Sequence, residues 1–174
     1  MKLWKFTDKH DRTHGGMQWG ENITHGPTSG EGNLCGPGWL HAYADPLLGV
    51  MMVPTHLSFK ARHLWEAEGK VGKTDGLKVG VRTLTTKRRV EPPKVTTKQR
   101  VRFAVLCAME VCDDSRWLRW ARGWLSGADC SGKSATDAAA SAADTAAWAA
   151  ADAATKPIDF AALAVKACKN DRGG

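Results

Sequence analysis

The chain has 174 residues, of which 43% are hydrophobic and 25% are charged, and its formal net charge is +7. These proportions are typical of folded globular proteins and argue against intrinsic disorder, collagen-like fibres and coiled coils. No apolar run approaches the roughly 18 residues of a membrane span, and the first residues lack the apolar core of a secretory signal. We therefore expect a cytoplasmic protein without a membrane partner.

The positive charge is concentrated in one segment. Between Lys60 and Arg102 there are thirteen Lys and Arg residues against four Asp and Glu residues, a local charge of +9. Such asymmetry favours an anionic partner, whether a nucleic acid, a nucleotide or an acidic protein. Nucleic acid is less favoured, because Trp65 is the only aromatic residue available for base stacking in this segment. The alternative is a strand with a solvated basic face.

The first elements alternate with loop-like sequence. Lys2–Thr7 alternates polar and apolar residues and predicts a strand, whereas the polar, glycine-rich stretch Asp8–Asn33 predicts a long loop. Trp39–Tyr43 predicts a second strand. A short helix over Leu47–Met52 follows, with Asp45 at its N-cap and proline at its first position.

A hairpin is predicted in the second half of this region. His63–Glu68 and Leu77–Val90 have the composition of strands, and the pair Asp75-Gly76 between them is a turn signal. Two consecutive prolines at residues 92 and 93 then close a first lobe over residues 1–94.

Helix signals dominate the rest of the chain. Thr96 and Gln99 form a capping box that opens one helix. The next helix carries Trp117, Trp120 and Trp124 at the spacing i, i+3 and i+7. Indoles at this spacing favour packing between helices over a ligand platform.

The C-terminal part is rich in alanine. Ser134–Thr155 predicts one long helix whose small side chains allow close packing, within the lobe or across an oligomer interface. Asp159 predicts the cap of a last helix, and we expect a homo-oligomer formed through these C-terminal helices. The predicted fold class is α+β, with an N-terminal small mixed α/β lobe followed by a C-terminal helical bundle over residues 95–174 that contains the long Ala-rich helix.

Motifs for metal, phosphate and nucleophile chemistry are incomplete. The five cysteines include no CxxC pair, and the six histidines, all within the first 63 residues, lack a second tight ligand pair. The stretch before Lys73-Thr74 has Ala67 where a phosphate loop needs glycine, and a turn follows it instead of a helix. We predict no metal, cofactor or catalytic residue, and leave enzymatic turnover open.

The most informative pattern in the sequence is three ring-bearing side chains at alternate positions of one predicted strand. Trp39, His41 and Tyr43 project from one side of the predicted strand, where an indole, an imidazole and a phenol can hold a planar polar ligand. The alternative is a packed core with a satisfied histidine. If the rings face an open hollow, the ligand-binding residues we predict are Trp19, Glu21, Asn22, Trp39, His41, Tyr43, Glu66 and Arg82.

Several of these segments resemble a family of small proteins of unknown function carried by phages and prophages. The resemblance rests on the loop Trp19–Asn22, the G-W-L-H motif at Gly38–His41, Pro46–Leu48, Thr96–Val101 and the Ala-rich tail. It implies a phage-type accessory protein in the host cytosol. More loosely, Gly38–His41 resembles a strand of ADP-ribosyltransferase-like proteins, which implies an NAD-type ligand.

These observations lead to one expected function and two alternatives. We expect a protein that binds a small anionic nucleotide, NAD-derived or cyclic, and sequesters it to counter host defence. The ring-bearing strand would orient the base, Glu21, Asn22 and Glu66 would read hydroxyl or amino groups, and Arg82 would meet phosphate. One alternative is an ADP-ribosyltransferase-like enzyme that uses Glu66 or Glu68. The other is an inhibitory module that docks on a host defence protein through a basic face that includes Arg88 and Arg89.

Overall fold

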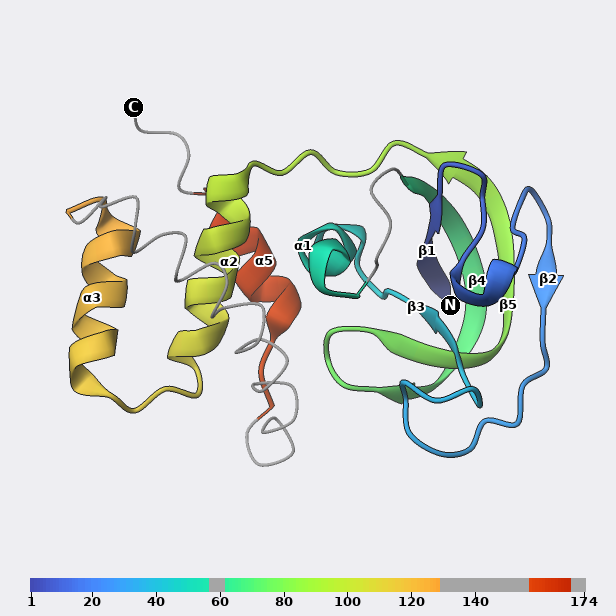
Figure 1. Ribbon diagram of the computed structural model, residues 1–174, viewed down its shortest axis with the longest axis horizontal. Helices are drawn as coiled ribbons and strands as arrows, with labels where there is room; N and C mark the ends of the chain where they lie inside the picture. The colour runs from blue at the N-terminus through green and yellow to red at the C-terminus, as the bar shows by residue number, and fades with distance from the viewer. Residues whose placement is uncertain (57–61, 129–156, 170–174) are drawn as a thin grey trace. The chain divides into compact units, whose positions relative to one another are not determined.

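The structure is a computed structural model that describes residues 1–56, 62–128 and 157–169 (Figure 1). It divides into two compact units, Met1–Lys94 and Val95–Gly174. Each unit has its own core and is described separately.

The first unit is built on an antiparallel sheet in the order β1-β4-β5-β2, with β3 also paired to β5. Its strands are β1 (Lys2–Asp8), β2 (Thr24–His25), β3 (Leu40–Ala42), β4 (Arg62–Thr74) and β5 (Val79–Val90). A short 3-10 helix, η1 (His14–Gly16), lies in the segment between β1 and β2. The segment that the sequence predicted as one long loop therefore contributes a strand to the sheet.

The sheet closes on itself. At the end of β3, Tyr43 and Trp4 of β1 exchange two backbone hydrogen bonds, each 2.9 Å from nitrogen to oxygen. The pairing therefore runs from β1 to β4, from β4 to β5 and from β5 to β3. The bridge between Tyr43 and Trp4 then connects the end of β3 back to β1. The enclosed core consists of Leu3, Trp19, Leu40, Ala42, Ala67, Val79, Val81 and Leu84. Because neighbouring residues on a strand face opposite sides, Trp39 and His41 lie on the outside of β3.

Helix α1 (Pro46–His56) packs against the outer side of β1. The Asp45 carboxylate accepts a hydrogen bond from the Leu48 amide at 2.8 Å, which confirms the predicted cap. Gly49 allows the close approach, because a Cβ atom there would lie 2.8 Å from the ring of Phe6 and 3.0 Å from that of Tyr43.

The β4–β5 hairpin turns at Asp75 and Gly76, as predicted. The Asp75 carboxylate accepts hydrogen bonds from the amides of Leu77 and Lys78, and Gly76 has a φ of 81°. Strand β4 is longer than predicted and includes the stretch that resembles a phosphate loop. Its extended backbone there pairs with the start of β5, between Val71 and Val81 and between Lys73 and Gly80.

The second unit contains the helices α2 (Thr97–Met109), α3 (Ser115–Ser126) and α5 (Phe160–Lys169), and α2 contacts both of the others (Figure 1). The predicted capping box of α2 is confirmed, since the Thr96 hydroxyl and the Gln99 side chain each accept the other residue's amide. The Asp159 carboxylate caps α5 through the Ala162 amide at 2.9 Å.

The three tryptophans of α3 pack against α2, as their spacing predicted. Trp117, Trp120 and Trp124 lie against a cluster formed by Val101 and Val105 of α2 and the fully buried Ala121. The rings of Trp117 and Trp120 also contact each other, with 5.9 Å between their centroids.

The predicted fold class is wrong. The first unit is not a small mixed α/β lobe but a five-stranded, mostly antiparallel sheet with one α-helix. The reason is that local patterns predict strands but not their partners, and β4 and β5, with 13 and 12 residues, pair along most of their length. The described part of the second unit has few helices, and the predicted Ala-rich helix over residues 134–155 lies outside the described residues.

Candidate functional site

A glycine-rich loop, residues 26–38, connects β2 to β3 and runs beside β5. The Thr28 amide donates a hydrogen bond to the Arg82 carbonyl of the strand. Within the loop, the Gly30 amide donates to the Gly38 carbonyl, and both hydrogen bonds are 2.9 Å long. Gly26 has a φ of 106°, and a Cβ atom there would lie 2.2 Å from the Arg82 carbonyl oxygen. Only glycine allows the loop to lie this close to β5.

The Trp39 side chain packs against two glycines, whose missing side chains leave space for its ring. Its half-buried ring lies over Gly72 of β4 and Gly80 of β5, where added Cβ atoms would be 2.6 Å and 3.1 Å from ring carbons. The indole Nε1 donates a hydrogen bond of 3.4 Å to the Gly32 carbonyl. The ring is thus positioned by the missing side chains of the two glycines against it and by the hydrogen bond from its edge to the loop.

His41 lies opposite Gly80 in the sheet and is half-buried. Its Nε2 hydrogen-bonds to the carbonyl of Leu34. Burial lowers the pKa of His41, the Leu34 carbonyl partly offsets this, and the positive charges of Lys5 and Lys78 lower it further. The Leu34 carbonyl can only accept, so Nε2 carries the proton and Nδ1 of the neutral ring is left as an acceptor.

Basic side chains surround this loop. Lys73 Nζ donates to the Gly32 carbonyl at 2.9 Å, and Arg82 Nε donates to the Thr28 carbonyl at 3.0 Å. Within the described residues neither of the two forms an ion pair, so their remaining N–H groups are available to an anion. Lys78 differs, because it lies 3.5 Å from the Asp75 carboxylate and donates to the exposed Cys35 thiol at 3.2 Å.

Lys5 adds a positive charge inside the closed sheet. It is 8% exposed, donates a 2.7 Å hydrogen bond to the His41 carbonyl, and lies 5.0 Å from the ring centroid of Trp19. Burial lowers the pKa of Lys5 to about 8. The backbone of β3 at His41 is therefore hydrogen-bonded, on the inner side of the sheet, to the Lys5 ammonium group.

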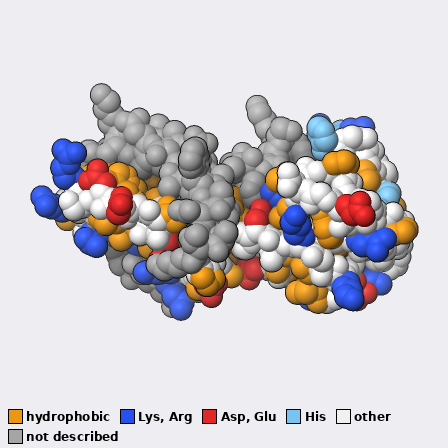
Figure 2. All heavy atoms as spheres, turned by 90° about the horizontal axis from the view of Figure 1, so that it is seen from below, with side chains coloured by type: hydrophobic (Ala, Val, Ile, Leu, Met, Phe, Trp, Pro, Cys, Tyr) orange, Lys and Arg blue, Asp and Glu red, His pale blue; other side chains and the backbone are white. Residues whose placement is uncertain are grey.

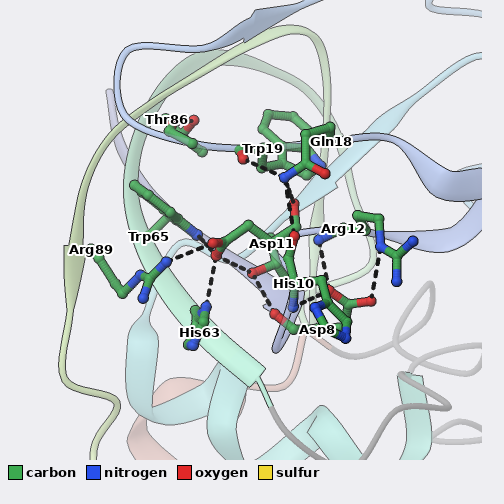
Figure 3. A network of polar contacts seen from close by, with 12 residues as sticks. Asp8, His10, Asp11, Arg12, Gln18, Trp19, His63, Trp65, Thr86 and Arg89 are labelled. Atoms are coloured by element: carbon green, nitrogen blue, oxygen red, sulfur yellow. Dashed lines mark hydrogen bonds and ion pairs between the residues drawn. The ribbon is translucent and has the colours of Figure 1, made fainter.

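A second cluster centres on Asp11 (Figure 3). One carboxylate oxygen accepts from His63 Nδ1 at 2.7 Å and from Trp65 Nε1 at 3.0 Å, and the other lies 2.6 Å from Arg89 Nη2. Burial alone would raise the pKa of Asp11, but these hydrogen bonds and the Arg89 charge lower it overall. The Thr7 hydroxyl donates to the same carboxylate at 3.3 Å.

The Asp11 cluster ties the segment after β1 to β4 and β5. Asp11 has a φ of 59°, a conformation that aspartate tolerates better than most residues. No local sequence pattern indicates this cluster, because His63, Trp65 and Arg89 lie 52 to 78 residues from Asp11. Both carboxylate oxygens of Asp11 are engaged by side chains of the same unit, which is the arrangement of a structural cluster.

The structure brings together Trp39, His41 and Arg82 of the predicted ligand residues. Trp19 instead lies in the core, 1% exposed, with its Nε1 bonded to the Thr13 hydroxyl at 3.0 Å. Tyr43 leaves β3 on the same side as Trp39 but is 6% exposed, edge-on to Phe6.

The other three predicted residues lie elsewhere. Glu21 and Asn22 are exposed in the turn before β2, and Glu66 is 2.8 Å from both Lys2 and Arg88. Seven residues of β4 separate Glu66 from Lys73, which is about 20 Å of strand.

No group of three His, Cys, Asp or Glu side chains that could hold a metal ion occurs among the described residues. Of the helices in these parts of the chain, none has the length and apolarity needed to cross a bilayer. Profiles of known protein families, curated proteins and solved structures were compared with the chain, and none of them matches it.

Proposed function

We propose that this protein binds a small anionic nucleotide, NAD-derived or cyclic, at the face formed by Trp39, His41, Lys73 and Arg82. The observation that carries the proposal is the pair of cations, Lys73 and Arg82, whose described hydrogen bonds go only to loop carbonyls beside a half-exposed indole. The resemblance to phage proteins adds the role of an accessory protein that sequesters the nucleotide.

Each part of this face suits one part of a nucleotide. The indole of Trp39 offers a flat surface on which a base can stack, and stacking of this kind contributes about 1–3 kcal/mol per base. Arg82 has N–H groups left for a bidentate contact with phosphate, and Lys73 supplies a second positive charge. The free Nδ1 of His41 can accept a hydrogen bond from a hydroxyl or amino group.

The contacts of the two candidate glutamates support a protein that binds the nucleotide without converting it. Glu66, which an ADP-ribosyltransferase-like reaction would use, is held between Lys2 and Arg88, and Glu68 lies 3.2 Å from Lys87. A docking role for Arg88 and Arg89 has less support, since both are engaged by carboxylates of the same chain.

Isothermal titration calorimetry of the full chain tests the proposal. NAD, ADP-ribose and a cyclic dinucleotide are titrated, with adenosine as the uncharged control, at a protein concentration of about 100 µM, which suits micromolar dissociation constants. We expect heat from at least one phosphate-bearing ligand and none from adenosine. No heat from any ligand would overturn the proposal.

Variants then locate the binding site. Trp39→Ala is expected to weaken binding by about 10-fold or more, the equivalent of one stacked base, and Lys73→Gln with Arg82→Gln to weaken it further. Arg88→Gln is the matched control, because this exposed arginine lies on the same sheet but outside the proposed face. A loss in Arg88→Gln as large as that in the Lys73 and Arg82 variant would mean that net charge, not this face, binds the ligand.

A further inference from the structure

Helix α3 has two very different sides. Its apolar side chains lie against α2, and Ala121 on that side is fully buried. Arg116, Arg119 and Arg122 follow each other at intervals of three residues and are all exposed, with Arg116 at 89%. Residues three or four positions apart share a helix side, so the arginines form one row facing solvent.

This row carries almost no compensating negative charge. Helix α3 contains no Asp or Glu, and among the described residues the carboxylate that forms an ion pair with the row is that of Asp114, 4.0 Å from Arg116 Nε. Among the described residues no ion pair involves Arg119 or Arg122. In Figure 2, blue side chains, with red ones among them, lie at the end of the view where α3 lies.

From these observations we propose that the arginine row of α3 binds the phosphate backbone of a nucleic-acid duplex, at a site separate from the nucleotide face. The first and last of the three arginines are six positions apart, which is about 9 Å along the helix. A duplex carries one negative charge per about 1.7 Å of its axis, so this length faces several phosphates. Guanidinium groups bind phosphate oxygens in a bidentate manner.

Charge and polarity distinguish a duplex from other anionic partners. Between its arginines, this side of α3 carries the exposed Ser115 and Ser126 and the half-buried Gly123, with no apolar side chain. Protein interfaces depend on buried aromatic or aliphatic anchors, and surface-bound membrane helices depend on a free apolar side. Phosphate contacts need only the cations, and the missing side chain at Gly123 leaves room for a backbone to approach.

Fluorescence anisotropy of a labelled 20-base-pair DNA duplex with the full chain tests this proposal. The duplex is titrated at several sodium chloride concentrations from 50 to 200 mM, and the slope of log K against log salt is compared between proteins. The triple variant Arg116→Gln, Arg119→Gln and Arg122→Gln is expected to bind at least about 10-fold more weakly, with a slope shallower by about 2.7, which is 0.9 per lost phosphate contact.

The matched control is Lys98→Gln, Lys166→Gln and Lys169→Gln, which removes the same charge from exposed positions on α2 and α5. It should bind nearly as well as the wild type. Circular dichroism checks the folding of both variants, which we expect to be unchanged because the substituted positions are exposed.

Three results would overturn the proposal. The first is no binding to the duplex at 50 mM salt, and the second is an equal loss in the lysine variant. The third is arginine-dependent binding only to a polyglutamate peptide or to phosphatidylserine vesicles, which would assign the row to an acidic protein or to a lipid surface. The nucleotide face is intact in all of these variants, so the outcome is independent of it.

Discussion

Lys5 is a buried cation that no carboxylate neutralises within the described residues. Its ammonium group is held by the His41 carbonyl and by the ring of Trp19, which together offset only part of the cost of removing the charge from water. Burial lowers the pKa of Lys5 to about 8, whereas an unfolded chain has a lysine pKa near 10.4. The folded protein is therefore destabilised by this charge below pH 8.

The pH dependence of stability follows from these two values. Between about pH 8 and 10.4 the unfolded state holds the Lys5 proton more tightly, so the free energy of unfolding rises with pH. The rise is at most about 3 kcal/mol, from 1.36 kcal/mol per pKa unit. Urea unfolding at pH 7.5 and pH 10 should show this gain in the wild type relative to Lys5→Met. Parallel pH profiles for the two proteins would contradict it.

Asp11 is the residue on which the second cluster depends. Asp11→Ala leaves His63, Trp65 and Arg89 without their shared acceptor, and we expect the free energy of unfolding to fall by about 2–4 kcal/mol. The pKa of Asp11 is lowered in the folded state, so its contribution is present above about pH 4 and is lost as the pH falls through the lowered pKa.

Chemical unfolding at pH 7 measures this effect. Asp113→Ala is the control, since Asp113 is exposed and its loss should change stability by less than about 0.5 kcal/mol. A loss for Asp11→Ala no larger than that of the control would mean that the cluster does not stabilise the unit.

The hairpin of β4 and β5 positions Trp39 through its glycines. A Cβ atom at Gly72 would meet only the Trp39 ring, at 2.6 Å and 2.8 Å. Gly72→Ala should therefore displace the indole without disturbing the core, and nucleotide affinity should fall by about 10-fold, as for the loss of one stacked base. Calorimetry measures the affinity, and Thr83→Ala, at an exposed position of β5, is the control. Unchanged nucleotide affinity in Gly72→Ala would mean that the position of the Trp39 indole does not matter for binding.

Elements defined by neighbouring residues were predictable from the sequence. The cap at Asp45, the turn at Asp75 and the capping box of Thr96 each depend on residues within four positions, and the structure has all three. That Trp39 and His41 share one side of the strand followed from its period of two, but which side faces the core did not.

Features that depend on distant residues were not predictable. The closure of the sheet joins Trp4 to Tyr43, and the Asp11 cluster joins β1, β4 and β5, so neither leaves a local pattern. Trp19 shows the same limit, because its loop sequence gave no sign that the ring fills the core. The fold class was wrong for this reason, and the predicted site residues are spread over several places in the first unit.

At the scale of the whole molecule, the nucleotide face belongs to one unit alone. Trp39, His41, Lys73 and Arg82 and the core beneath them all lie within Met1–Lys94. A fragment of residues 1–94 should therefore fold and bind the nucleotide with an affinity within about threefold of the full chain. The reason is that distant residues with no shared partners contribute independently, so removing residues beyond Lys94 should leave the face unchanged. Circular dichroism and calorimetry check both points, and a folded fragment that fails to bind would place part of the site beyond residue 94.

The most direct test of the nucleotide face follows the indole N–H signals of the eight tryptophans by NMR as ADP-ribose or the nucleotide found by calorimetry is added. The Trp39 signal is assigned by its disappearance in Trp39→Phe, and the buried Trp19 serves as the internal reference. The account predicts that the Trp39 signal shifts in a saturable way while the Trp19 signal stays in place. A nucleotide that binds with measurable heat and leaves the Trp39 signal unmoved would contradict it.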